Sequence, residues 1–137
     1  MAFKLTPYVE PEHQEQIQDV RTLKILLRPN VCWTAIDHGH SLNREIGRNG
    51  EEIGRLEARL RVARGVRSGI PDFLFWAEGR PYAIERKIRG GILSENQRVF
   101  HEELRGAGVP VVTCRSQREL CDVLTAWGLM RPYRDAA

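Results

Sequence analysis

Charged residues stand in two short apolar stretches of this sequence, where charge needs a reason. Asp72 opens the stretch DFLFWA, and Glu85 and Lys87 interrupt the stretch YAIERKI. Two carboxylates that share a half-buried surface repel each other unless a cation lies between them. Mg²⁺ suits such a pair, because it binds one or two carboxylates, keeps several waters and leaves positions for phosphate oxygens.

These residue types indicate a definite chemistry, the hydrolysis of a phosphodiester. Water activated by the metal can attack phosphorus, and a lysine can orient that water or stabilise the charge that develops. The alternative is structural. A salt bridge between Asp72 and Lys87 across two strands, with Glu85 at an exposed edge, needs no metal.

The two apolar stretches are predicted to form a β-hairpin. A two-residue loop at Gly79-Arg80 pairs Asp72 with Lys87 and Leu74 with Glu85. Side chains alternate across a strand and directly opposed residues share a face, so Asp72, Glu85 and Lys87 project together. The other face is then apolar and must be core; it carries Phe73, Phe75, Tyr82, Ile84 and Ile88.

Hydrophobic periodicity and capping signals predict the remaining elements, in the order α-β-α-β-β-α-β-α. A helix from Pro11 precedes a strand at 31–36, and a second helix runs from Glu51, after an Asn49-Gly50 turn, to Gly65. After the hairpin (72–77 and 82–88), capping boxes at 94–97 and 116–119 open two more helices around a strand at 109–114.

This order predicts an α/β fold with a mixed central sheet flanked by helices on both faces. The length of 137 residues fits one domain, with a core at about 10–127 and a loose tail at 131–137. No apolar run is long enough to span a membrane, and the start MAFKLTPYVEP has no apolar signal region. Three widely spaced cysteines predict a reducing, cytoplasmic compartment.

The net charge of +3 is concentrated in one segment, residues 43–67, which holds seven arginines and four glutamates. Clustered arginine is suited to phosphate, because the guanidinium fork binds it bidentately. A solvated helix face with i,i+4 ion pairs is an equally good interpretation of the charge alone. The candidate DNA-binding residues in this segment are Arg44, Arg48, Arg55, Arg59 and Arg67.

The ordered motifs resemble the PD-(D/E)XK nuclease superfamily, and in detail its VRR-NUC family. That family runs a helix into a G-V-x-x-G-x-P-D strand, then an E-x-K strand, a glycine break and an S-x-x-Q helix start. The matching pieces here are residues 65–72, 85–87, 90–91 and 94–97, and the resemblance covers most of the chain. It implies a restriction-endonuclease-like core.

The resemblance also implies roles for individual residues. Asp72 and Glu85 would be metal ligands, together with the backbone carbonyl of Arg86, and Lys87 would be the catalytic lysine. Gln97 would position the water or Lys87, although a Gln at the third position of a capping box has a purely structural role as well. Glu12, in the first helix, would be a further catalytic acid, and Glu15, one turn on, could replace it.

One piece departs from the family pattern. After its first strand the family commonly has a P-N-G turn, where this chain has Asp37-His38-Gly39-His40. His38 would stand in the place of the asparagine, so a contact with the site is possible. Two alternating histidines also suggest zinc, but no third ligand has suitable spacing, which favours a polar loop.

The activity implied by the resemblance is that of a stand-alone DNA endonuclease dependent on Mg²⁺ or Mn²⁺. Stand-alone members resemble junction-resolving enzymes of DNA repair and recombination and work as dimers. We therefore expect branched DNA, such as a four-way (Holliday) junction, as substrate and a homodimer as the assembly. The alternatives are an inactive DNA-binding module with a nuclease-like core and a sequence-specific restriction-type nuclease. We expect no organic cofactor, no membrane partner, and a bacterial, phage or prophage origin.

Overall fold

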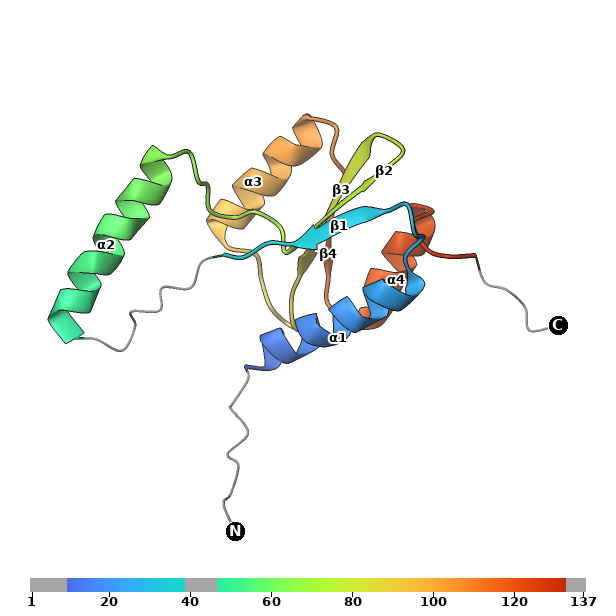
Figure 1. Ribbon diagram of the computed structural model, residues 1–137, viewed down its shortest axis with the longest axis horizontal. Helices are drawn as coiled ribbons and strands as arrows, with labels where there is room; N and C mark the ends of the chain where they lie inside the picture. The colour runs from blue at the N-terminus through green and yellow to red at the C-terminus, as the bar shows by residue number, and fades with distance from the viewer. Residues whose placement is uncertain (1–9, 39–46, 133–137) are drawn as a thin grey trace, which may run out of the picture.

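The computed structural model describes residues 10–38 and 47–132, with the backbone alone over 47–54. Its elements follow the predicted order (Figure 1). They are α1 (Pro11–Leu26), β1 (Cys32–Ala35), α2 (Gly47–Ala63), β2 (Phe73–Ala77), β3 (Arg80–Arg86), α3 (Glu95–Gly106), β4 (Val111–Cys114) and α4 (Gln117–Ala126). Three of the helices begin where the sequence predicts them: Pro11 opens α1, and the side chains of Ser94 and Ser116 cap α3 and α4.

The four strands form one mixed sheet in the order β1-β2-β3-β4. The pairs β1–β2 and β2–β3 are antiparallel, whereas β3 and β4 are parallel and α3 makes the crossover between them. A parallel pair needs such a crossover, because its strands run the same way and a tight turn cannot join them. The predicted α/β class, with a restriction-endonuclease-like arrangement of sheet and helices, is confirmed.

The hairpin differs from the prediction in its register. Its two turn residues are Glu78 and Gly79, with φ of 48° and 73°, and not Gly79 and Arg80. Positive φ at both central residues is the geometry of a type I′ turn, which matches the twist of the flanking strands. The predicted pairing of Asp72 with Lys87 is therefore wrong.

The corrected register pairs Phe73 with Ile84, so its continuation by one residue sets Asp72 opposite Glu85. The prediction was displaced by two residues, and a displacement of two leaves every side chain on its predicted face. Asp72, Glu85 and Lys87 therefore share one side of the hairpin, as predicted, but the two carboxylates now face each other directly.

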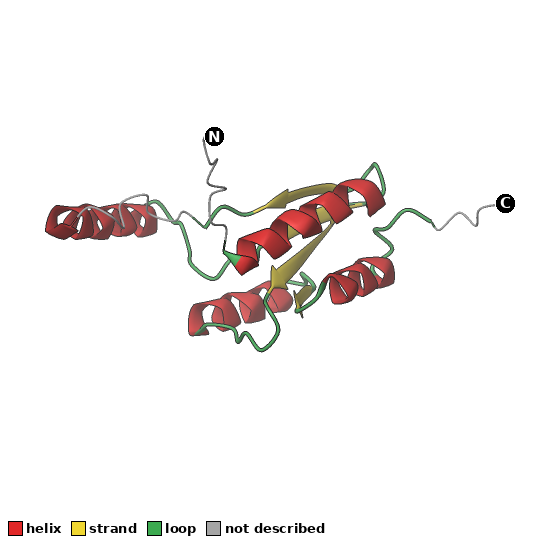
Figure 2. Ribbon diagram, turned by 90° about the horizontal axis from the view of Figure 1, so that it is seen from below, coloured by secondary structure: helices red, strands yellow, loops and turns green. Residues whose placement is uncertain are grey.

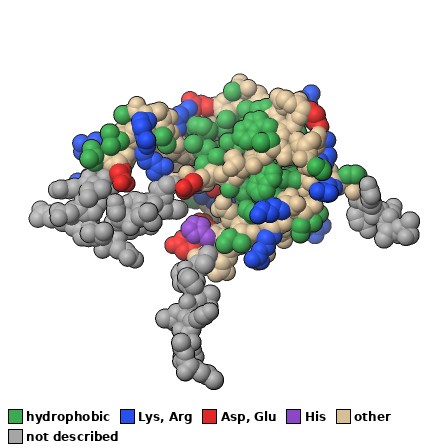
Figure 3. Space-filling view, in the orientation of Figure 1, with side chains coloured by type: hydrophobic (Ala, Val, Ile, Leu, Met, Phe, Trp, Pro, Cys, Tyr) green, Lys and Arg blue, Asp and Glu red, His purple; other side chains and the backbone are tan. Residues whose placement is uncertain are grey.

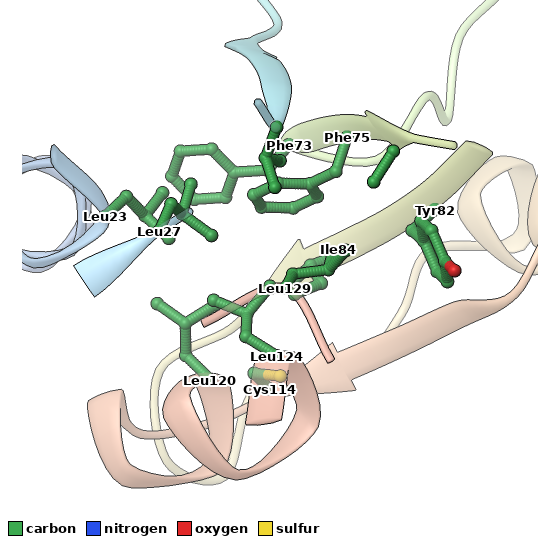
Figure 4. Close-up of a cluster of buried hydrophobic side chains, with 12 residues drawn as sticks. Leu23, Leu27, Phe73, Phe75, Tyr82, Ile84, Cys114, Leu120, Leu124 and Leu129 are labelled. Atoms are coloured by element: carbon green, nitrogen blue, oxygen red, sulfur yellow. The ribbon is translucent and has the colours of Figure 1, made fainter. Parts of the chain in front are cut away.

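The apolar face of the hairpin is core, as predicted, except at Ile88, which lies beyond the end of β3 and is half-buried. Phe73, Phe75 and Ile84 are fully buried, and Tyr82 is nearly so. Figure 4 shows leucines of α1 and α4 closing over these side chains from the same side of the sheet. Burying a side chain of this size contributes about 1.5–3 kcal/mol, so this cluster is what fixes the two helices on the sheet.

Helix α3 covers the opposite face of the sheet from α1 and α4 (Figure 1). Under it, Ala83 and Glu85 of β3 are buried, and so is His101 of α3 itself. A carboxylate and an imidazole are thus enclosed on the face that holds the charged residues of the hairpin.

Helix α2 begins earlier than predicted and stands apart from the sheet. It starts at Gly47 and runs through Asn49-Gly50, so the predicted turn there is wrong. A turn signal is only a local preference, and one glycine inside a helix costs about 1 kcal/mol. Figures 1 and 2 both show α2 extending away from the other elements. Its side chains Leu56 and Leu60 are 55% and 53% exposed.

The end of the described chain is anchored. The backbone N–H of Arg131 donates to the carbonyl of Leu26, and its side chain donates to that of Leu27. The predicted loose tail therefore does not begin at Arg131, and residues 133–137 lie outside the described residues. Within the described ranges, no helix has both the length and the apolar character needed to cross a membrane.

Candidate active site

A cleft of about 940 Å³ lies between α1 and the sheet. It is lined by Asp72, Glu85 and Lys87 of the hairpin, by Gln97 of α3, and by residues of α1 that include Glu12. The structure thus brings the predicted catalytic side chains together from four separate segments. Histidine and acidic side chains gather on the visible surface near α1 (Figure 3).

Asp72 is held from two directions at the start of β2. Its Oδ2 accepts the backbone N–H of Arg86 at 2.7 Å, and its Oδ1 lies 3.1 Å from Nε2 of His38. This hydrogen bond to Asp72 raises the pKa of His38. The contact that the sequence left open for His38 therefore exists. His40 and the rest of that loop lie outside the described residues.

Glu85 is enclosed, with an exposed fraction of 2%. Its Oε1 accepts a hydrogen bond from Nε2 of Gln97 at 3.0 Å and lies 3.9 Å from Nζ of Lys87. Burial, and next the charge of Asp72, raise the pKa of Glu85 to about 8. Two facing carboxylates of this kind are stable as a charged pair only with a cation beside them.

Gln97 closes the capping box of α3 and also reaches a carboxylate of the cleft. Its Oε1 accepts the backbone N–H of Ser94, which closes the capping box, while its Nε2 donates to Glu85. The amide can do both because it has an acceptor and donors on different atoms. Its target is Glu85, whereas the sequence suggested water or Lys87.

Two glycines let the backbone approach closely around these side chains. A Cβ on Gly69 would lie 2.3 Å from the carbonyl oxygen of Asn96, so only glycine lets the segment before Asp72 lie against the start of α3. The side-chain stem of Lys87 lies against Gly91, in the glycine break. The glycine of the G-x-P-D motif therefore helps to position Asp72.

The Arg86 side chain lies on the other side of β3 and ties it to α1. Its Nε donates to Asp19 at 2.7 Å, and its guanidinium also contacts Glu15 at 3.0 Å. Asp19 is 1% exposed, and its burial raises its pKa against the opposing effect of Arg86. Removing one partner of such a buried pair typically costs about 3–5 kcal/mol, so this pair fixes α1 beside the site.

This pair also bears on which acid of α1 serves the site. Glu15 is engaged with Arg86, whereas the charge of Glu12 is among the causes that raise the pKa of Glu85. Glu12 therefore remains the better candidate, as the sequence suggested.

The donor set fits a hard divalent cation. Oε2 of Glu85 is buried and has no hydrogen-bond partner among the described residues, so a lone pair is free for a ligand. The backbone N–H of Arg86 donates to Asp72 and so points toward the site. In a strand the N–H and C=O of the same residue point to the same side, so the carbonyl of Arg86 also points toward the site. This direction favours that carbonyl as a third ligand. Within the described chain, no three His, Cys, Asp or Glu side chains converge on one point. Mg²⁺ does not need three such side chains, because it keeps several waters as ligands.

The arginines of the basic segment differ in their surroundings. Arg67 is paired with Glu103 and lies over the ring of Phe100, so it holds the segment before β2 onto α3. Arg55 and Arg59 are exposed on α2. Arg44 and the side chain of Arg48 lie outside the described residues. Of the three candidates whose side chains the structure describes, Arg55 and Arg59 are thus the pair best placed to meet a ligand.

Sequence reasoning missed several residues that contribute to the cleft. His101 faces Glu85 from α3, and Arg21 and Lys24 line the cleft from α1. His101 had a usable signal, because it follows Gln97 by four residues and so lies on the same helix face. Arg21 and Lys24 had none, since a cation on an amphipathic helix is common.

The raised pKa of Glu85 leads to a prediction for the metal-free protein. In the folded chain its pKa is about 8, whereas its ordinary value is 4.5. Between pH 4.5 and pH 8 the folded chain therefore binds more protons than the unfolded chain. The resulting stability is complete below the unfolded pKa and is lost as the pH rises through the folded value. We expect Glu85→Gln to have the higher melting temperature at pH 9 in EDTA, by several degrees, and a smaller advantage at pH 5. Thermal unfolding of both proteins across this range measures the effect. Parallel curves would contradict it.

Comparison with known proteins agrees with this geometry. No curated protein and no solved structure matches the chain. The family model for the VRR-NUC domain matches residues 10–118, a range that includes Glu12, both facing carboxylates, Lys87 and Gln97. Since the match covers most of the chain and the cleft holds the motifs that define the site, the chain belongs to the VRR-NUC domain family, a family of the nuclease type.

Proposed function

We propose that this protein is a DNA endonuclease that hydrolyses phosphodiester bonds with Mg²⁺ or Mn²⁺. The observation that carries the proposal is the pair of facing carboxylates, Asp72 and Glu85, in a cleft beside Lys87. A structural salt bridge would not need the second carboxylate, nor would it enclose Glu85 so completely.

Each side chain has a role that follows from its position. Asp72, Glu85 and the carbonyl of Arg86 would hold the cation, which when bound supplies a polarised phosphate and an acidified water. Lys87 stabilises charge that develops on the phosphate, since its ammonium lies beside the carboxylates. Gln97 holds Glu85 in orientation, and Glu12 adds an acid at the rim.

The cleft also indicates where the DNA backbone runs. Along α1 the helical rise sets Lys24 about 18 Å from Glu12. Arg21 and Lys24 are exposed on the cleft wall, and no partner is found for either within the described ranges. Ile17 and Val20 lie between them and the acidic end. A strand passing the metal site would therefore meet two cations at the far end of α1.

Two pairs of cations can be compared by the salt dependence of DNA binding. Each lost phosphate contact should lower the slope of log K against log salt by about one unit, for every DNA alike. We expect this for Arg21→Ala/Lys24→Ala and for Arg55→Ala/Arg59→Ala, with little change of kcat at saturating DNA. Arg118→Ala, on α4 outside the cleft, is the control. If the slope is unchanged in either double variant, the two side chains of that variant are only solvated and do not contact DNA phosphates.

Helix α2 supports the proposal of a homodimer. Leu56 and Leu60 form an apolar stripe that the rest of the described chain leaves exposed. Because this stripe does not pack on the sheet of its own chain within the described residues, it offers a surface on which a second subunit could pack. Two copies related by a two-fold axis would present two sites to a branched junction.

Charge placed on the stripe should separate the subunits. We expect Leu56→Glu/Leu60→Glu to give a monomer by light scattering, where the unaltered chain is a dimer. Val62→Glu is the matched control, because Val62 is 71% exposed and lies on another side of α2. Monomers should still nick DNA but lose paired cuts across a junction. A double variant that stays dimeric would place the interface elsewhere.

Cleavage of a four-way junction and of a linear duplex of the same sequence tests the proposal as a whole. We expect the junction to be cut with Mg²⁺ or Mn²⁺ and not with EDTA. Binding without cutting under all conditions would identify an inactive DNA-binding module. Cutting of linear duplex at one recurring sequence would identify a restriction-type nuclease.

A further inference from the structure

One buried polar group near the cleft has no role in the function proposed above. His101, on α3, is fully buried, and neither of its ring nitrogens has a hydrogen bond within the described part of the chain. An unsatisfied buried polar group typically costs about 1–3 kcal/mol. An apolar residue would avoid this cost, so packing alone does not explain the histidine.

A carboxylate oxygen of the candidate metal ligand lies close to the ring of His101. Its Nε2 lies 3.5 Å from Oε2 of Glu85, the oxygen that accepts no hydrogen bond from the described residues. The second oxygen, Oε1, is already held by Gln97. Gln97 and His101 are four residues apart on α3, so one face of one helix addresses both oxygens of the carboxylate.

The chemistry of the two groups fixes the direction of this contact. When Glu85 is ionised, as it must be to bind a cation, its carboxylate only accepts hydrogen bonds, so the imidazole donates through Nε2–H. A donor on one lone pair of each oxygen holds the carboxylate plane and leaves the other lone pairs for a cation. Outer partners of this kind commonly orient the ligands of a metal, and their loss lowers metal affinity about 10- to 100-fold.

We propose that His101 is a positioning residue, which orients Glu85 as a metal ligand by donating a hydrogen bond to Oε2. The inference rests on the proposed function, since it assumes that Glu85 binds a divalent cation. Helix α3 then presents two hydrogen-bond donors, Gln97 and His101, which together set the orientation of the Glu85 carboxylate.

Mn²⁺ binding to the full chain, measured by titration calorimetry without DNA, tests the inference. The variants are His101→Gln, whose amide nitrogen reaches the place of Nε2, and His101→Asn, whose shorter side chain does not. His101→Leu removes the donor and keeps the bulk. Val99→Ala, on the same helix and 43% exposed, is the control.

We expect His101→Asn and His101→Leu to bind Mn²⁺ about 10- to 100-fold more weakly than the unaltered chain. His101→Gln should recover most of the affinity. Thermal unfolding in EDTA should show His101→Leu at least as stable as the unaltered chain, which a purely structural histidine would not allow. If His101→Leu fails to fold, the comparison of His101→Gln with His101→Asn still tests the inference. Equal Mn²⁺ affinities of those two variants would overturn it.

The outcomes separate this inference from the proposed function. Normal Mn²⁺ binding in the His101 variants, with cleavage retained, overturns the positioning role and leaves the nuclease proposal standing. If Mn²⁺ binding depends on His101 but the unaltered chain cleaves no DNA, the positioning role stands and the nuclease proposal is overturned. An unaltered chain that binds no Mn²⁺ overturns both.

Discussion

Alanine at Asp72 or at Glu85 will abolish DNA cleavage while the fold and DNA binding survive. The two carboxylates face each other across the hairpin, and each supplies oxygens that the other cannot replace. With one removed, a single facing carboxylate would be left to hold the proposed cation, which would supply the polarised phosphate and the acidified water. The expected loss is at least several orders of magnitude in rate, measured on junction DNA across a Mn²⁺ series.

The control for this experiment is an acid of the same hairpin that lies away from the cleft. Glu78, in the turn, is paired with Arg28 at the surface, and Glu78→Ala should leave cleavage unchanged. Glu85→Gln adds a variant without a cavity, so a lost activity can be assigned to charge. Near-normal cleavage by either alanine variant at any Mn²⁺ concentration would remove that residue from the site.

Lys87→Ala will lower the rate of cleavage by about 10²–10³-fold, or roughly 3 kcal/mol or more, as for other single donors to a transition state. Mn²⁺ binding will survive, because a charged ammonium offers no lone pair to a metal. Metal titration and single-turnover kinetics on the same protein separate these two effects.

The position of Lys87 makes this distinction sharp. Its Nζ lies 3.9 Å from Glu85, and its exposed fraction is 17%, so it borders the ligands and still reaches the cleft. Arg89→Ala, two residues further on and exposed, is the matched control. If Mn²⁺ affinity falls together with the rate in Lys87→Ala, the lysine serves to hold the ligands and has no direct role in the reaction.

The sequence by itself determined the order of elements and the faces of the hairpin. Capping at Ser94, the proline at Pro11 and strand alternation are local signals, each complete within a few residues. Alternation also tolerates a register error of two, which is why Asp72 and Glu85 were placed on one face although their direct opposition was not foreseen.

Only the tertiary structure decided which partners these residues have. The turn at Glu78 set the register, and the packing of α3 on the sheet brought His101 to Glu85. The bond between Arg86 and Asp19 joins residues 67 apart in the chain. Such contacts depend on how the helices pack on the sheet. The burial of apolar surface drives this packing, but it is non-directional and does not by itself specify which polar side chains meet. A local pattern therefore identifies the side chains that can do chemistry, whereas the packing of distant segments decides which of them meet.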